Sequence, residues 1–253
     1  MNFESVLAHH LIDHKLFNFM VGPLNLGLSP LVITMWAAAL IATATLSFAA
    51  RSQSCAARRA RGMIEPVALF VRDDILEPIF GHHARYYLPY FLTLFFFLLT
   101  CNLLGLVPYA KGVTANIAVT ASMALCTFFL IQFAGVKEQG LVSYIVHIVP
   151  GGVPWWLWPL LFIIEFFGMF AKCISLCIRL FANMLAGHIV SLSFLFLIFI
   201  FAQMSKVLGF GVSPAAIGLA LFIYVMDVLV SFLQAYIFTF LTALFVGGAV
   251  HPH

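Results

Sequence analysis

One apolar run limits the fold of this chain more than any other feature. It extends from residue 155 to residue 203 and holds very few ionisable side chains. A helix needs only about 20 residues to cross the roughly 30 Å apolar core of a bilayer, so this run exceeds one ordinary span. Of the 253 residues, 64% are apolar and 8% are charged, whereas about a quarter of the residues of a soluble domain are charged. The sequence therefore predicts an all-α integral membrane protein.

Five apolar segments are long enough to cross a bilayer. The first three are shorter, and the last two are joined by the interruption "KVLGFGVSP". A helix over the final segment would be about 54 Å long at 1.5 Å per residue, so it must tilt or kink. We predict that the last two segments form a long tilted hairpin. The predicted spans are residues 28–50, 86–107, 114–135, 155–203 and 215–250.

The segments between the spans predict the topology. Residues 66–80, "PVALFVRDDILEPIF", place apolar residues at helical spacing among charges, which is typical of an amphipathic helix at the membrane interface. Six of the twelve Lys and Arg residues lie between the first two spans, so the positive-inside rule makes this loop cytoplasmic. Residues 1–27 then lie outside, as a periplasmic or interfacial segment without the apolar core of a signal peptide. We expect residues 1–253 to form a single membrane domain.

Charged residues are rare after Leu160, and most of them interrupt apolar sequence. Such residues cost roughly 2.5–3.5 kcal/mol each at membrane depth, so they indicate a functional site unless a partner offsets the cost. Lys206 falls in the interruption, where water is accessible. The formal charges of this region are Glu165, Lys172, Arg179, Lys206 and Asp227.

Helical geometry sorts these residues into faces. Glu165, Lys172 and Arg179 are spaced by seven and drift only about 20° per step, so they form one stripe. His188 follows Arg179 by nine residues and points the opposite way if the helix is continuous. In the last segment Asp227 shares a face with Ser231 and Gln234. The hairpin could therefore pair His188 with the Asp227 face.

The residue types favour proton transfer, although simpler interpretations stay open. Arginine cannot release its proton in a protein, whereas histidine and buried carboxylates titrate near neutral pH. The combination suggests a proton path with an electrostatic barrier in its middle. Alternatively, Glu165 could simply pair with Lys172, Asp227 with Arg179, and Gln234 could join helices through its amide.

A short motif carries a family resemblance. The stretch "SLCIRLFANMLAGH" resembles the signature of subunit a of the rotary F-type ATP synthase, the membrane stator beside the ring of c subunits. "FIIEFFGMFAKCISL", "LQAYIFTFLTAL", "NLLGLVPY" and "TANIAVTASMAL" are similar to other segments of that family. The resemblance covers residues 86–250 well, and the N-terminal third, with "HHLIDH", only by pattern.

The resemblance implies a role for each polar residue. Arg179 would face the c-ring carboxylate, favour its ionised form and stop protons from crossing directly between two aqueous half-channels. Some members carry an acid and a histidine where this chain has His188 and Asp227, so the pair is exchanged here. Many members have an acid where this chain has Asn116, and Lys172 has no assigned role. The residues that the resemblance places along the half-channels are Glu165, His188, Asp227, Gln234, Asn183 and Asn116.

The resemblance thus implies a proton-channel subunit, for which we expect no catalytic residues, cofactors or bound metal. Its expected partners are the c-subunit ring, the peripheral-stalk b subunits and the lipid bilayer. A formal charge of +3 argues against nucleic acid. We expect the inner membrane of a bacterium rather than of an organelle. The main alternative is a proton-coupled secondary transporter, although paired broken helices are not visible; an intramembrane metalloenzyme is weaker, since H-E-x-x-H is missing.

Overall fold

The computed structural model describes residues 17–21, 24–51, 55–107, 112–140, 154 and 156–250. The "HHLIDH" stretch lies outside these residues. The chain divides into two compact units whose segments alternate along the sequence, and each unit is described by itself. Unit 1 holds residues 1–42, 97–117 and 180–234, and unit 2 holds residues 43–96, 118–179 and 235–253.

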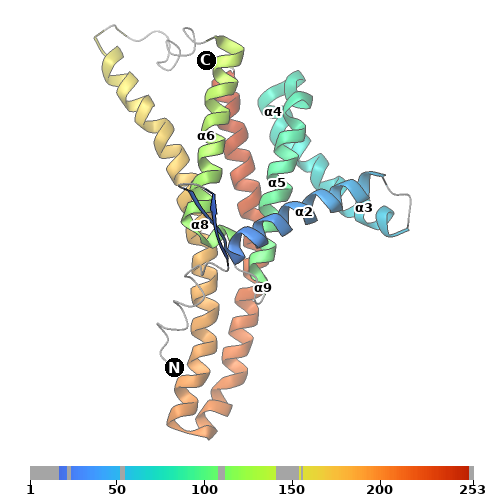
Figure 1. Ribbon diagram of the computed structural model, residues 1–253, viewed down its shortest axis with the longest axis vertical. Helices are drawn as coiled ribbons and strands as arrows, with labels where there is room; N and C mark the ends of the chain where they lie inside the picture. The colour runs from blue at the N-terminus through green and yellow to red at the C-terminus, as the bar shows by residue number, and fades with distance from the viewer. Residues whose placement is uncertain are drawn as a thin grey trace. The chain divides into compact units, whose positions relative to one another are not determined.

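Five long helices account for most of the described chain (Figure 1). Each is long and apolar enough to cross a membrane. This confirms the predicted all-α membrane fold with five spanning helices, of which the last two form the predicted hairpin. The helices are α2 (Pro30–Arg51), α5 (Ala84–Leu106), α6 (Ile117–Gln139), α8 (Trp158–Met204) and α9 (Lys206–Val250).

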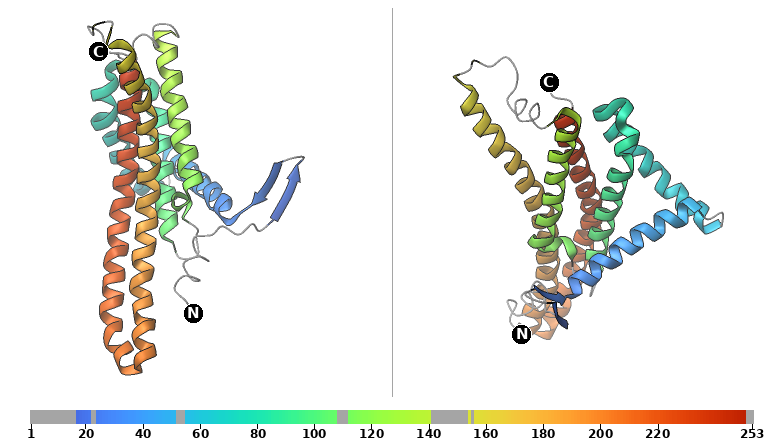
Figure 2. Two further views of the ribbon diagram at one scale, coloured as in Figure 1. Left: turned by 90° about the vertical axis from the view of Figure 1, so that its left-hand side faces the viewer. Right: turned by 45° about the horizontal axis from the view of Figure 1, so that its top comes forward.

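The hairpin has a tighter turn than the sequence predicted. Only Ser205 separates α8 from α9, so α9 begins at Lys206 rather than at residue 215. The arms of the hairpin within unit 1 run side by side in every view (Figure 2). A Cβ atom at Gly209 would lie 2.8 Å from the Cα of Ala202, so the missing side chain lets the two helices meet directly after the turn. Pro214 is inside α9, where it removes one backbone donor without ending the helix.

A small β-hairpin precedes the first helix and was not predicted. Strand β1 (Phe17–Val21) pairs antiparallel with β2 (Leu24–Leu28), and Phe17 lies opposite Leu28. The sequence "LNLGL" alternates apolar and small or polar residues with the period of two that is typical of a strand. The prediction instead placed Leu28 at the start of the first span. Leu28 belongs to an apolar stretch that continues into the span, and average hydropathy does not reveal the two-residue alternation of a short strand.

The predicted amphipathic helix exists but is longer and irregular. It comprises α3 (Cys55–Phe70), the π-helical turn η1 (Val71–Leu76) and α4 (Glu77–Phe80), followed by the 3₁₀ turn η2 (Gly81–His83). Val71, Ile75, Leu76 and Phe80 are buried, whereas Asp73, Asp74 and Glu77 are exposed. Its amphipathic pattern is therefore real, and its place at the membrane interface stays a prediction.

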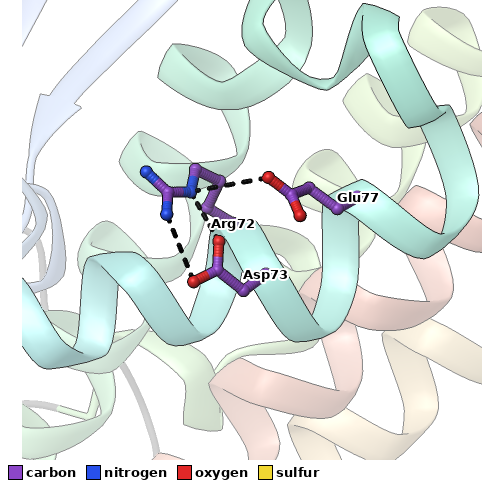
Figure 3. A network of polar contacts seen from close by, with 3 residues as sticks. All are labelled: Arg72, Asp73 and Glu77. Carbon is purple, nitrogen blue, oxygen red and sulfur yellow. Dashed lines mark hydrogen bonds and ion pairs between the residues drawn. The ribbon is translucent and has the colours of Figure 1, made fainter.

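A charged cluster lies on the exposed side of η1 (Figure 3). The Nε of Arg72 donates to Oδ1 of Asp73 at 2.5 Å, and its Nη2 donates to Oδ2 at 3.2 Å. Glu77 lies 3.8 Å from the same Nε. The hydrogen bond and the charge of Asp73 raise the pKa of Arg72 above its usual value. Because these groups are exposed, they contribute little to stability.

Within unit 2, the end of α9 approaches α4 closely. A Cβ atom at Gly247 would collide with Cγ2 of Ile79, whereas nothing lies within 4 Å of a Cβ atom at the neighbouring Gly248. Cγ2 is bonded directly to the branched Cβ of Ile79, so it cannot move aside without rotating the whole side chain. The close contact therefore depends on a residue without a side chain at position 247.

We expect Gly247→Ala to lower stability by about 1–3 kcal/mol, the usual cost of overpacking a filled contact. The adjacent Gly248→Ala serves as the control, because it makes the same chemical change in open space. Thermal unfolding of the detergent-purified protein measures both. Equal unfolding temperatures for the two variants would contradict the close contact between α9 and α4.

Candidate functional site

Arg179 lies on the exposed side of α8. Leu176 and Leu180, on either side of it in the sequence, are 3% and 1% exposed, whereas the arginine itself is exposed. Within the described part of unit 2, no carboxylate forms an ion pair with this guanidinium. The helix thus presents a permanent positive charge outward in the middle of a 46-residue apolar segment.

Small side chains flank Arg179 on one side of α8. Ser175, Ala182 and Ala186 are exposed and lie within about 60° of Arg179 around the helix axis. Small residues along a membrane helix allow another helix to approach its backbone closely. A neighbouring helix could therefore approach this side of α8 closely beside the arginine.

Glu165 and Lys172 form an ion pair on the same helix. The Nζ of Lys172 lies 3.7 Å from Oε1 of Glu165, and both side chains are more than 40% exposed. The ammonium group also lies over the ring of Phe245 in α9, 5.4 Å from its centroid. The simpler interpretation of this pair is thus confirmed. It does not exclude a role in proton transfer, because an exposed ion pair contributes little to stability and leaves the carboxylate accessible.

His188 and Asp227 lie in unit 1, on the two arms of the hairpin. A Cβ atom at Gly187 would lie 2.7 Å from both carboxylate oxygens of Asp227. The carboxyl group therefore reaches the backbone of α8 next to His188. The Nε2 atom of His188 is buried, and it lies 3.0 Å from the position of a Cβ atom at Gly112. The structure thus brings Asp227 to the predicted segment of α8 and directs the imidazole Nε2 toward the chain before α6.

The predicted polar face of α9 is confirmed by its burial. Ser231 and Gln234 are 4% and 5% exposed, and Asp227 is half-buried. The intervening Phe232 and Leu233 are exposed at 40% and 45%. The i, i+4, i+7 spacing therefore places the polar groups toward the protein and the large apolar groups away from it.

Comparisons with known proteins point to one family. The family model described as ATP synthase A chain matches residues 32–247. The chain is 40% identical over 255 residues to the ATP synthase subunit a of Myxococcus xanthus, with 97% of this chain and 82% of that protein covered. It is 38% identical over 258 residues to the ATP synthase subunit a of Chloroherpeton thalassium, with 96% and 75% covered. The chain belongs to the ATP synthase A chain family.

The remaining predicted residues of this ATP synthase A chain member lie near the same segments. Asn183 is on α8, one turn after Arg179, and is half-buried. Asn116 ends the short 3₁₀ turn η3 (Val113–Ala115), and its backbone N–H donates to the carbonyl of Val113. Among the described residues, no group of three or more His, Cys, Asp and Glu side chains could hold a metal ion. The roles of these residues in proton transfer stay predictions.

The sequence did not lead us to predict Asn102 as a site residue. It is only 3% exposed, and its carboxamide joins α5 to both η3 and α9. The sequence contained a signal, because an asparagine inside an apolar span usually has a hydrogen-bonding partner. The partner could not be deduced, since Ser231 lies 129 positions further along the chain.

Proposed function

We propose that this protein is the proton-translocating stator subunit of an F-type ATP synthase. The observation that carries the proposal is the exposed Arg179 in the longest apolar helix of an ATP synthase A chain member. A guanidinium in contact with lipid is costly. A partner that supplies a carboxylate at this depth removes that cost, and the strip of small residues beside Arg179 leaves room for the partner's helix.

The partner fitting this surface is the ring of c subunits. When a protonated carboxylate of the ring approaches Arg179, the positive charge favours loss of its proton. The arginine cannot itself carry the proton onward, because it stays charged throughout the physiological pH range. Protons must then enter the ring on one side of Arg179 and leave on the other, which couples their flow to rotation.

Two groups of polar residues serve as the half-channels in this proposal. Glu165 lies before Arg179 along α8, His188 follows it toward the hairpin turn, and Asp227 and Gln234 are on α9. Asn116 and Asn183 add polarity near the second group. The protein makes and breaks no covalent bond, so the chemistry of ATP synthesis belongs to other subunits of the complex.

The proposal also includes the membrane location and orientation of the subunit. The matching relatives are bacterial and five helices are able to span a membrane, which supports a multi-pass protein of the bacterial inner membrane. By the positive-inside rule, the basic residues after α2 support an end of α2 in the cytoplasm and an N-terminus outside. The b subunits of the peripheral stalk would hold the protein against the turning ring.

Reconstitution with and without the c-ring tests the proposal. We expect proteoliposomes that hold the subunit alone to show no proton conductance above empty liposomes, and those that also hold the ring to conduct. Fluorescence of an entrapped pH dye after a potassium-diffusion potential measures the flux. A proton-coupled transporter would instead move protons with a substrate in the absence of the ring, and that result would overturn the proposal.

A further inference from the structure

Asn102 forms the centre of a buried hydrogen-bond network in unit 1. Its Nδ2 donates to the backbone carbonyl of Ser231 at 3.3 Å, and its Oδ1 accepts from the hydroxyl of Thr114 at 2.9 Å. All three residues are at most 4% exposed. One carboxamide thus joins α5, η3 and α9.

The bond to Ser231 holds α9 next to its titratable carboxylate. Ser231 follows Asp227 by four residues and precedes Gln234 by three, so the three residues share one face of α9. A second bond ties the same helix on the other side of Asp227, because the hydroxyl of Tyr224 donates to the carbonyl of Leu106 at 2.8 Å. Leu106 is the last residue of α5. The end of α5 therefore holds α9 on both sides of Asp227.

The bond to Thr114 connects this support to His188. Thr114 lies in η3, and Gly112 immediately precedes that turn. The Nε2 of His188 lies 3.0 Å from where a Cβ atom of Gly112 would be. The same network thus supports the backbone against which the imidazole packs and the helix that carries the carboxylate.

We propose that Asn102 is a positioning residue for proton transfer, which sets the placement of Asp227 on α9 relative to His188 on α8. The inference rests on the proposed function, because the relative position of Asp227 and His188 matters only if both residues line a half-channel. Asn102 forms its hydrogen bonds with Ser231 and Thr114 rather than with the carboxylate of Asp227. Its effect comes from the two elements that it joins.

In the described part of unit 1, few other titratable groups surround Asp227, so its position relative to α8 should dominate its proton affinity. Among the described side chains of unit 1, the titratable groups are Cys101 on α5, His188 on α8, and Tyr224 and Asp227 on α9. Tyr224 donates to the backbone carbonyl of Leu106, and Asp227 lies against Gly187, which has no side chain. A displaced α9 therefore changes how Asp227 meets α8 and water, with few other charges to compensate. Displacements of about 1 Å in such constellations can slow a reaction on the order of a hundredfold.

Asn102→Leu tests the proposal in the whole ATP synthase, because leucine keeps the branched side-chain skeleton and removes both hydrogen bonds. We expect normal assembly, a pumping rate about tenfold lower, and a shift of about half a pH unit or more in the pH of half-maximal ATP-driven pumping. Inverted membrane vesicles with a pH-sensitive dye give both quantities. A lower rate with an unchanged pH midpoint, or a wild-type rate, would overturn the positioning role.

A matched pair keeps the test decisive if Asn102→Leu fails to assemble. Thr114→Val removes only the hydroxyl that donates to Asn102, whereas Thr114→Ser keeps it, so we expect a shifted midpoint in the first and a wild-type midpoint in the second. Thr239→Val is the control for a buried threonine, since that hydroxyl bonds the carbonyl of Ala235 in its own helix. Equal midpoints in all three variants would contradict the proposal. Arg179→Ala, measured in parallel, tests the proposed function separately. If this variant still pumped, the proposed function would be wrong, whereas the midpoints of the Thr114 variants would still report on the contacts of Asn102.

Discussion

Replacement of Arg179 by alanine is expected to abolish ATP-driven proton pumping while the complex still assembles. A unit positive charge about 4 Å from a carboxylate contributes on the order of 4 kcal/mol near a protein surface. Its loss should therefore disfavour the ionised ring carboxylate by roughly a thousandfold. Arg179 is exposed and pairs with no carboxylate in the described part of unit 2, so the change should not disturb the packing of the subunit itself. Dye quenching in inverted vesicles measures the pumping rate.

The same variant should also let protons leak through membranes from which the soluble head has been removed. Without the permanent charge, protons can cross directly between the two half-channels, and rotation no longer limits the flux. Arg59→Ala is the matched control, because that arginine is exposed on α3 and lies outside the spanning helices. Pumping by Arg179→Ala at a rate near that of Arg59→Ala would contradict the proposed function.

Arg179→Lys separates the charge from the shape of the group. Lysine keeps the positive charge but lacks the planar fork that binds a carboxylate in two places, and its pKa falls readily in an apolar environment. We expect Arg179→Lys to pump at less than about a tenth of the wild-type rate. Full activity would show that charge alone suffices at this position.

The local patterns of the sequence were enough to predict the helices and the shared face of three polar residues on α9. Apolar length determined the five spans, and the spacing of Asp227, Ser231 and Gln234 predicted a common face that is indeed turned toward the protein. Both are properties of one helix at a time. The opposite directions of Arg179 and His188 followed in the same way, because α8 is continuous from Trp158 to Met204.

Contacts between distant segments could not be predicted. Asn102 meets Ser231, and Gly187 meets Asp227, across long stretches of chain whose packing no periodicity reveals. The start of α9 was missed for a related reason. Two glycines and a proline after Lys206 favoured a loop, but Gly209 instead allows a close approach to Ala202 on α8. The start of α9 therefore depends on tertiary packing, which overrides the local preference of glycine and proline for a loop.

Replacement of Gly187 by alanine has the second largest expected effect. The added methyl group would lie 2.7 Å from both oxygens of Asp227 and 2.9 Å from its Cγ. The entire carboxyl group must therefore turn or withdraw from α8, because no single atom can yield alone. The half-buried aspartate has room to move, so we expect the complex to assemble and ATP-driven pumping to fall on the order of a hundredfold.

Gly168→Ala is the matched control for this variant, since Gly168 is on the same helix and a Cβ atom there meets nothing within 4 Å. Both variants gain the same helix propensity, so a difference between them reports the contact with Asp227 rather than the stiffness of α8. Gly187→Ala combined with Asp227→Asn keeps the collision but removes the titratable group. If the collision acts through the carboxylate, this double variant should pump no less than Asp227→Asn alone. A further loss in the double variant would mean that the methyl group disrupts the hairpin itself, and that the contact between Gly187 and Asp227 has only a packing role.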